Sequence, residues 1–164
     1  MKKVLFVLFL ISSSLVISLP VASQDIILTP KLGSSVLYGL RSFAGVELQA
    51  SSVSVTAKWC PIVINNVYSN GFSISATIYL YEYSSSPFFS TSILYEGKKN
   101  IDKLTNKSAR SMPIFAGYRF YPAEYFNHIS KNLSFDLGTG VELCSNTSVR
   151  PYLEFSANFN IFKY

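Results

Sequence analysis

The residues of this sequence that could do chemistry are charged side chains placed at alternate positions among apolar ones. In the segment NLSFDLGTGVELC, residues 132–144, Asp136 and Glu142 share one phase, while the other phase from Leu133 to Leu143 is apolar. Successive side chains of a β-strand point to opposite faces, so the segment has one polar and one apolar face. Such spacing allows ion pairing and hydrogen bonding along the polar face. The same phase elsewhere holds Arg41, Glu47, Lys58, Glu96, Arg119 and Glu154.

The elements that carry these charges are predicted to be strands, because alternation recurs along the chain and helical periodicity is scarce. A weaker candidate at 25–32 would bring the number to eight, although Pro30 demotes it to an edge strand or a non-strand. The other strands are expected at 36–48, 53–62, 72–83, 88–96, 113–121, 132–144 and 151–162.

The first residues indicate export. Residues 1–23 contain two lysines, an apolar and serine-rich run, and the small residues Val21 and Ser23, which is the pattern of a secretory signal peptide; a membrane anchor is the alternative. Residues 24–164 then form a single domain. Without Lys2 and Lys3 this domain has 12 basic and 9 acidic residues, a net charge of +3 that is too small to favour nucleic-acid binding.

The composition is apolar for an exported protein. Hydrophobic residues make up 49% of the chain and charged residues only 14%, whereas an average soluble domain has roughly 25% charged residues. No segment after Gln24 approaches the roughly 18 consecutive apolar residues of a transmembrane helix. The apolar surface must therefore be carried by alternating strands.

Two architectures share this alternation. A soluble periplasmic, lipocalin-like barrel would turn its apolar face inward and bind a small ligand, whereas a membrane barrel turns that face toward lipid. The polar phase holds mainly serine, threonine, glycine and nearly balanced charges, which suit a narrow lumen better than a water-facing surface. The sequence therefore predicts an all-β, antiparallel up-and-down transmembrane β-barrel of about eight strands. Its predicted lumen charge network is Arg41, Glu47, Lys58, Arg119, Asp136, Glu142 and Glu154.

The signal peptide, the alternating strands and the terminal run FSANFNIFKY resemble the small outer-membrane β-barrel proteins of Gram-negative bacteria. The resemblance covers residues 24–164 as a pattern, without a diagnostic motif. It implies an outer-membrane location and recognition of Phe162 and Tyr164 by the barrel-assembly machinery. These two residues lie in the phase opposite to Phe159 and Ile161, so the chain needs a β-bulge near Asn160 or a last pair outside the ladder.

If both termini lie in the periplasm, as the resemblance implies, the predicted connections fall into two sets. The periplasmic turns are 49–52, 84–87 and 122–131. The outward loops are 33–35, 63–71, 97–112 and 145–150.

The predicted outward loop 97–112 is basic, with Asp102 as its only acidic residue. Clustered cations attract anions, so this loop would contact the phosphates of lipopolysaccharide. A solvated loop that its charge keeps soluble is the favoured interpretation. The anion-contacting candidates are Lys98, Lys99, Lys103, Lys107 and Arg110.

Cys60 and Cys144 are the only cysteines, in a protein expected where disulfides persist. They belong to the predicted third and seventh strands, on opposite sides of a ring of eight. A disulfide needs Cα atoms within about 7 Å, so separate thiols are favoured over a disulfide.

The sole histidine gives a second, weaker resemblance. His128, Ser130 and Glu142 resemble the His-x-Ser…Glu arrangement of outer-membrane lipid A 3-O-deacylases, in which a base-activated serine attacks an ester and an acid orients the base. However, Lys131 stands where those enzymes have asparagine, and the predicted topology puts His128 and Ser130 in a periplasmic turn. A polar turn with an incidental histidine is the favoured interpretation.

The expected function is therefore a structural or surface-interaction role, adhesin-like and non-enzymatic, for a monomeric barrel whose lumen is filled by its own side chains. An outer-membrane lipid A ester hydrolase and a soluble lipocalin-like ligand-binding barrel are the alternatives. The sequence has no glycine-rich phosphate loop, nucleotide fingerprint or metal-ligand cluster, so neither a cofactor nor a metal is expected.

Overall fold

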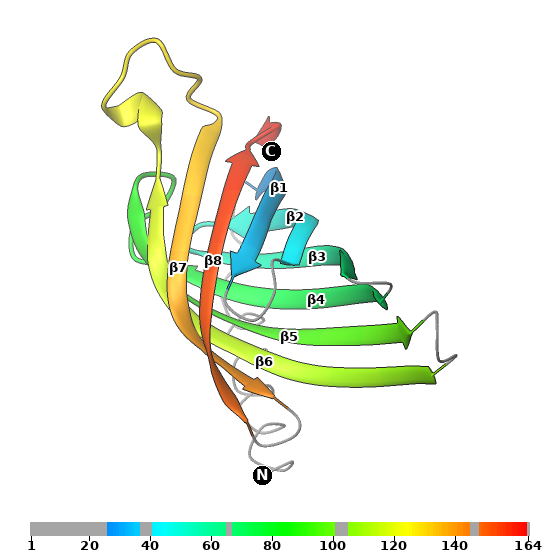
Figure 1. Ribbon diagram of the computed structural model, residues 1–164. Helices are drawn as coiled ribbons and strands as arrows, with labels where there is room; N and C mark the ends of the chain where they lie inside the picture. The colour runs from blue at the N-terminus through cyan, green and yellow to red at the C-terminus, as the bar shows by residue number, and fades with distance from the viewer. Residues whose placement is uncertain (1–25, 37–40, 65–66, 101–104, 145–147, 164) are drawn as a thin grey trace.

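The computed structural model describes residues 26–36, 41–64, 67–100, 105–144 and 148–163, so the predicted signal peptide lies outside the described residues. The strands form one antiparallel sheet in which each strand from β1 to β8 pairs with the next along the chain, while β9 pairs with β1 (Figure 1). A short 3-10 helix, η1 (Pro122–Glu124), follows β6. The strands are β1 (Ile26–Val36), β2 (Arg41–Ala50), β3 (Val53–Ile64), β4 (Val67–Tyr79), β5 (Ser86–Asn100), β6 (Thr105–Phe120), β7 (Leu133–Cys144), β8 (Val149–Phe159) and β9 (Phe162–Lys163).

Strand β1 closes the sheet into a barrel. It pairs with β2 over ten residue pairs that begin at Ile26 and Ala50, and with β8 from Lys31 and Asn158 onward. The first and last long strands therefore lie side by side (Figure 1), and closure removes the unpaired edges that an open sheet would present. Strands β8 and β9 pair with successive parts of β1, so β9 extends β8 and the barrel wall has eight strands. The prediction of an all-β, eight-stranded, antiparallel up-and-down barrel is confirmed.

The polarity of the barrel is inverted relative to that of a soluble protein. Large apolar side chains of the outward phase are exposed, with Leu137 at 56% and Ile78 at 53%, whereas Glu47 is completely buried. The alternative of a lipocalin-like barrel with an apolar interior is therefore wrong. Among the described residues, no helix is both long and apolar enough to span a bilayer.

The chain ends on a β-bulge, as the phase of its last residues requires. The register between β1 and the C-terminal segment shifts by one residue, from Lys31 opposite Asn158 to Leu28 opposite Phe162. One extra residue therefore lies on the C-terminal side, at 160–161, which belongs to no strand.

Pro30 lies inside β1, so the prediction of an edge strand or a non-strand at 25–32 is wrong, as is a loop at 33–35. Backbone groups of alternate residues in a strand point to the same neighbour. The oxygen of Leu28 accepts a hydrogen bond from Ile161 N at 3.1 Å, and Pro30 shares the parity of Leu28. Its missing N–H thus faces the bulge, where the ladder is already interrupted.

The strands β3 to β6 extend further than predicted at one end of the barrel, although β4 ends at Tyr79, before the end of the predicted strand 72–83. Most of 63–71 and 97–112 is paired strand and not loop, with 65–66 and 101–104 outside the described residues. Hydrophobic alternation stops where side chains become polar, but backbone pairing continues to Asn100 opposite Thr105. The β5–β6 hairpin therefore projects beyond its neighbours (Figure 1).

At the opposite end of the barrel, the connections agree with the predicted turns better than the loops predicted at 63–71 and 97–112 do. Ser51 and Ser52 join β2 to β3, residues 80–85 join β4 to β5, and residues 121–132 join β6 to β7. The predicted strand at 36–48 begins at Arg41, and residues 37–40 lie outside the described residues, as do 145–147 of the predicted loop 145–150.

Candidate functional site: the charged lumen

Polar and charged side chains line the inside of the barrel, because every second residue of each strand points inward. Burying a charge is unfavourable unless it is paired and hydrogen-bonded. The contacts of the charged residues therefore decide what the lumen can do. Those buried here are Lys31, Glu47, Lys58, Arg119, Asp136, Glu142 and Glu154.

Arg119 on β6 is the centre of a four-charge cluster formed with Lys31, Glu47 and Asp136. Its guanidinium group donates five hydrogen bonds, which is its full capacity. Two reach Asp136, at 2.7 and 2.9 Å, and two reach Glu47, at 2.9 and 3.0 Å. The fifth reaches the Gln49 side-chain oxygen at 3.0 Å. Pairing of this forked kind is both strong and directional.

Lys31 on β1 completes the four-charge cluster. Its Nζ donates to Glu47 and to Asp136, both at 2.7 Å, so two cations meet two carboxylates. The Tyr79 hydroxyl donates to Glu47 at 3.1 Å, and the Tyr79 ring centroid lies 4.3 Å from the Arg119 guanidinium carbon, a cation–π contact. The cluster therefore ties β1, β2, β4, β6 and β7 together across the lumen.

A second ion pair joins β3 to β8. Lys58 Nζ lies 2.5 Å from Glu154 Oε1, and the Tyr152 hydroxyl also donates to Glu154. The same Lys58 Nζ lies 4.7 Å from the centroid of the Phe43 ring and 5.8 Å from that of Phe115. Both opposite charge and aromatic faces thus compensate the buried ammonium group.

Aromatic rings lie over glycines of the barrel wall. The Phe115 centroid is 6.1 Å from that of Phe88 and 5.0 Å from that of Tyr152. A Cβ atom built at Gly117 would lie 2.6 Å from the Phe88 ring, and one at Gly138 would lie 2.6 Å from the Phe115 ring. Glycine at these two positions is what lets the rings approach the wall.

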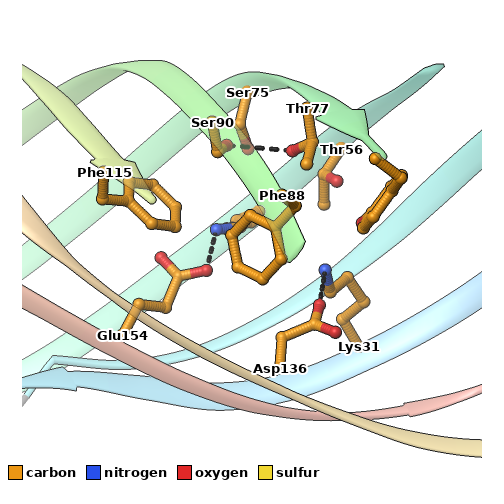
Figure 2. Close-up of a pocket in the computed structure, with 11 residues that line it drawn as sticks. Lys31, Thr56, Ser75, Thr77, Phe88, Ser90, Phe115, Asp136 and Glu154 are labelled. Atoms are coloured by element: carbon orange, nitrogen blue, oxygen red, sulfur yellow. Dashed lines mark hydrogen bonds and ion pairs between the residues drawn. The ribbon is translucent and has the colours of Figure 1, made fainter. Parts of the chain in front are cut away.

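The remaining space between the four-charge cluster and the Lys58–Glu154 pair is small. Figure 2 shows Lys31 bonded to Asp136 on one side of it, with Glu154 near Phe115 on the other. Threonines and serines of β3, β4 and β5 complete the lining, and Thr77 is hydrogen-bonded to Ser90 at 2.9 Å. The space has room for water but not for a larger solute.

The structure places the predicted lumen charges as follows. Six of them, all but Arg41, are buried inside the barrel; Arg41 belongs to β2, but its side chain lies outside the described residues. Glu142 is separate from the four-charge cluster and accepts a hydrogen bond from Ser111 Oγ at 2.7 Å.

Several lumen residues are absent from the predicted network. Lys31 is missing because Pro30 argues against a strand at 25–32. The alternation of Ile27, Thr29 and Lys31 with an apolar phase nevertheless indicates a strand there. The rings are missing because an aromatic residue in a polar phase resembles a lipid-facing residue. These rings belong to Phe43, Tyr79, Phe88, Phe115 and Tyr152.

The structure does not bring His128, Ser130 and Glu142 together. His128 and Ser130 are exposed in the 121–132 connection, whereas Glu142 is buried nine residues along β7 from Leu133. At about 3.4 Å per residue this is roughly 30 Å. The Ser130 hydroxyl accepts a hydrogen bond from Asn132 N at 3.2 Å instead. The predicted catalytic arrangement of a lipid A deacylase is therefore not formed by these three residues.

The two cysteines lie in the described part of the chain, and no disulfide joins them. Cys60 on β3 is paired in register with Gly71, and Cys144 on β7 with Ser111, so they belong to distant strands.

The basic residues predicted to contact anions lie mostly on the β5–β6 hairpin. Lys98 stands opposite Lys107 in the register, Lys99 stands opposite Asn106, and Arg110 is exposed on β6. Lys103 lies outside the described residues.

Comparison with known proteins identifies the fold. No protein-family model matches this sequence, and no curated protein matches it. The N-terminal β-barrel domain of Pseudomonas aeruginosa OprF is similar in structure, with a TM-score of 0.69, 12% sequence identity, and coverage of 85% of this chain and 100% of that domain. The chain has the fold of an outer-membrane β-barrel.

Two further solved structures agree with this fold. Outer membrane protein H (OprH) of P. aeruginosa has a TM-score of 0.58 and 10% identity, covering 84% of this chain and 99% of that protein. Neisserial surface protein A (NspA) has a TM-score of 0.50 and 8% identity, covering 85% and 97%. Identities this low establish a common fold and no more.

Proposed function

We propose that this protein is a monomeric integral outer-membrane β-barrel, exported by residues 1–23, with a structural or adhesin-like surface role and a lumen plugged by its own side chains. The observation that carries the proposal is the inverted polarity, in which leucine, isoleucine and phenylalanine are exposed around the wall while ions are buried. Such a surface is stable against lipid and unfavourable in water.

Cell fractionation tests the location. The expressed protein is expected in the outer-membrane fraction, with a gel mobility that changes when the sample is heated, because a closed barrel resists unfolding by detergent. A monomer that stays soluble in water without detergent would contradict the proposal.

The proposed plug rests on the four-charge cluster, the Lys58–Glu154 pair and the rings over Gly117 and Gly138. An eight-stranded barrel encloses only enough space for its own side chains. Purified protein in a planar bilayer is therefore expected to give no stable single-channel conductance. Steady conducting steps from protein of verified purity would refute the plug.

The proposed surface role belongs to the β5–β6 hairpin. With both chain termini in the periplasm, this hairpin projects outward with Lys98, Lys99, Lys107 and Arg110 near its end. We propose that it contacts the phosphates of lipopolysaccharide, since like charges at neighbouring register positions are unfavourable unless an anion lies between them.

Charge removal tests this contact. Replacing Lys98, Lys99 and Lys107 by glutamine is expected to weaken binding of the folded barrel to lipid A vesicles, and added salt should weaken wild-type binding in the same way. Replacing the same three lysines by arginine, which keeps the charge at these positions, is the matched control. Equal binding by the glutamine variant and the wild type would exclude the contact.

Assembly is proposed to depend on the C-terminal residues. Phe162 lies in β9 opposite Leu28 of β1, and Tyr164 ends the chain. Recognition of these aromatic residues by the barrel-assembly machinery predicts that Phe162→Ala and Tyr164→Ala together lower the amount of barrel in the membrane fraction. Their stability once folded in vesicles should change little by comparison.

A further inference from the structure

The 121–132 connection carries apolar side chains that the barrel does not cover. It is the longest connection in the described part of the chain, and Tyr125 is 63% exposed, Phe126 57% exposed and Ile129 also exposed. Neighbouring exposed apolar groups of this size are typical of an interaction surface.

Backbone hydrogen bonds stabilise the fold of this connection. It begins with η1, and Phe126 N donates to Pro122 O at 2.9 Å. Ile129 N donates to Phe126 O at 3.2 Å, and Leu133 N donates to Ser130 O at 3.1 Å. The apolar side chains are therefore presented by an ordered turn.

The neighbouring turn 80–85 fixes this connection from the side. Ser85 N donates to the Glu124 carboxylate at 2.7 Å, and Tyr121 N donates to Ser85 Oγ at 2.9 Å. The carboxylate of Glu124 is therefore already hydrogen-bonded within the protein, whereas Lys131 is exposed.

The apolar side chains continue the lipid-facing wall. The Tyr125 ring stacks on that of Phe120, with centroids 5.2 Å apart and planes 23° apart. Phe120 ends β6 in the outward phase and stands opposite Phe135, whose ring stacks on that of Phe155 at 6.1 Å. A row of aromatic rings therefore runs from the barrel wall into the connection.

We propose that Tyr125, Phe126 and Ile129 insert into the headgroup region of the phospholipid leaflet beside this end of the barrel and anchor the connection to it. A tyrosine ring, with its apolar body and polar edge, is stable at this depth, and the apolar side chains of Phe126 and Ile129 would leave water there. Lys131 has the charge that complements lipid phosphates. The inference rests on the proposed function, because it requires the wall to be in a bilayer.

Fluorescence quenching by brominated phospholipids tests the anchor in the folded barrel. Wild-type protein contains one tryptophan, Trp59, which is exposed on the wall and reports whether the barrel is in the bilayer. The variant Trp59→Phe with Phe126→Trp moves the reporter to the connection. The matched control is Trp59→Phe with Glu82→Trp, at an exposed position of the neighbouring turn, and heat-dependent gel mobility confirms that each variant is folded.

The expected result is blue-shifted emission for the Phe126→Trp variant, with quenching comparable to that of Trp59 and stronger for bromine near the glycerol than for bromine deep in the chains. The Glu82→Trp reporter should emit as in water and resist quenching. If Trp59 is quenched while the Phe126→Trp reporter emits as in water, the anchor is wrong and the barrel proposal stands. If Trp59 is not quenched either, the membrane-barrel proposal itself fails.

Discussion

Replacing Arg119 by methionine gives a direct test of the lumen network. Methionine has a similar length and no charge, so the change removes five donated hydrogen bonds and leaves Glu47 and Asp136 with Lys31 as their only cation in the four-charge cluster. Removing one partner of a buried ion pair costs about 3–5 kcal/mol. Because all five donors of Arg119 are used, we expect the upper half of that range, about 4–5 kcal/mol of unfolding free energy.

The assay is urea unfolding of the barrel in phospholipid vesicles, followed by Trp59 fluorescence and by gel mobility without heating. The free energy of unfolding is obtained by linear extrapolation to zero urea. The variant should unfold at a lower urea concentration with an unchanged slope, since the surface exposed on unfolding stays the same.

A double-mutant cycle with Asp136→Asn separates loss of the ion pairs from loss of packing. Asp136→Asn alone should also destabilise the barrel, but the double variant leaves one cation, Lys31, with one carboxylate, Glu47. The two effects should therefore sum to more than the double variant shows, by at least about 1 kcal/mol. A loss below about 1 kcal/mol for Arg119→Met, or additive effects, would refute the view that these charges form one network.

Three further outcomes are expected with the same unfolding assay or with gels. Gly138→Val should destabilise the barrel by about 1–3 kcal/mol, because the Phe115 ring occupies the space of the new side chain. Leu137→Arg should cost about 2–4 kcal/mol in vesicles, since the new charge would face lipid. Wild-type protein should run identically on gels with and without reductant, because no disulfide joins Cys60 to Cys144; a mobility that depends on reductant would contradict this arrangement.

The wall of the barrel could be predicted from the sequence because its signal is local. Leu137 and Asp136 are adjacent in the chain and on opposite faces of β7, so the two-residue period alone separates lipid from lumen. The polar ends of β5 and β6 could not be predicted in this way. There the strand persists through backbone pairing with a partner strand, while the side chains give no alternation.

The partners inside the lumen depend on register and could not be predicted either. Arg119 meets Glu47, 72 positions away, because eight strands close with one particular stagger. The prediction for the strand that contains Pro30 was wrong for a similar reason. Whether a proline breaks a strand depends on what faces its missing N–H, and here that is a bulge more than a hundred residues later.

The four-charge cluster has a consequence for the order of events during folding. Lys31 and Asp136 are separated by 105 positions, so their contact closes a loop of that length across the barrel. Closing a loop of this length carries an entropic cost before any contact compensates for it. A chain that ends before β7 would contain Arg119 without Asp136. The uncompensated charge in its lumen would destabilise the incomplete barrel in the bilayer.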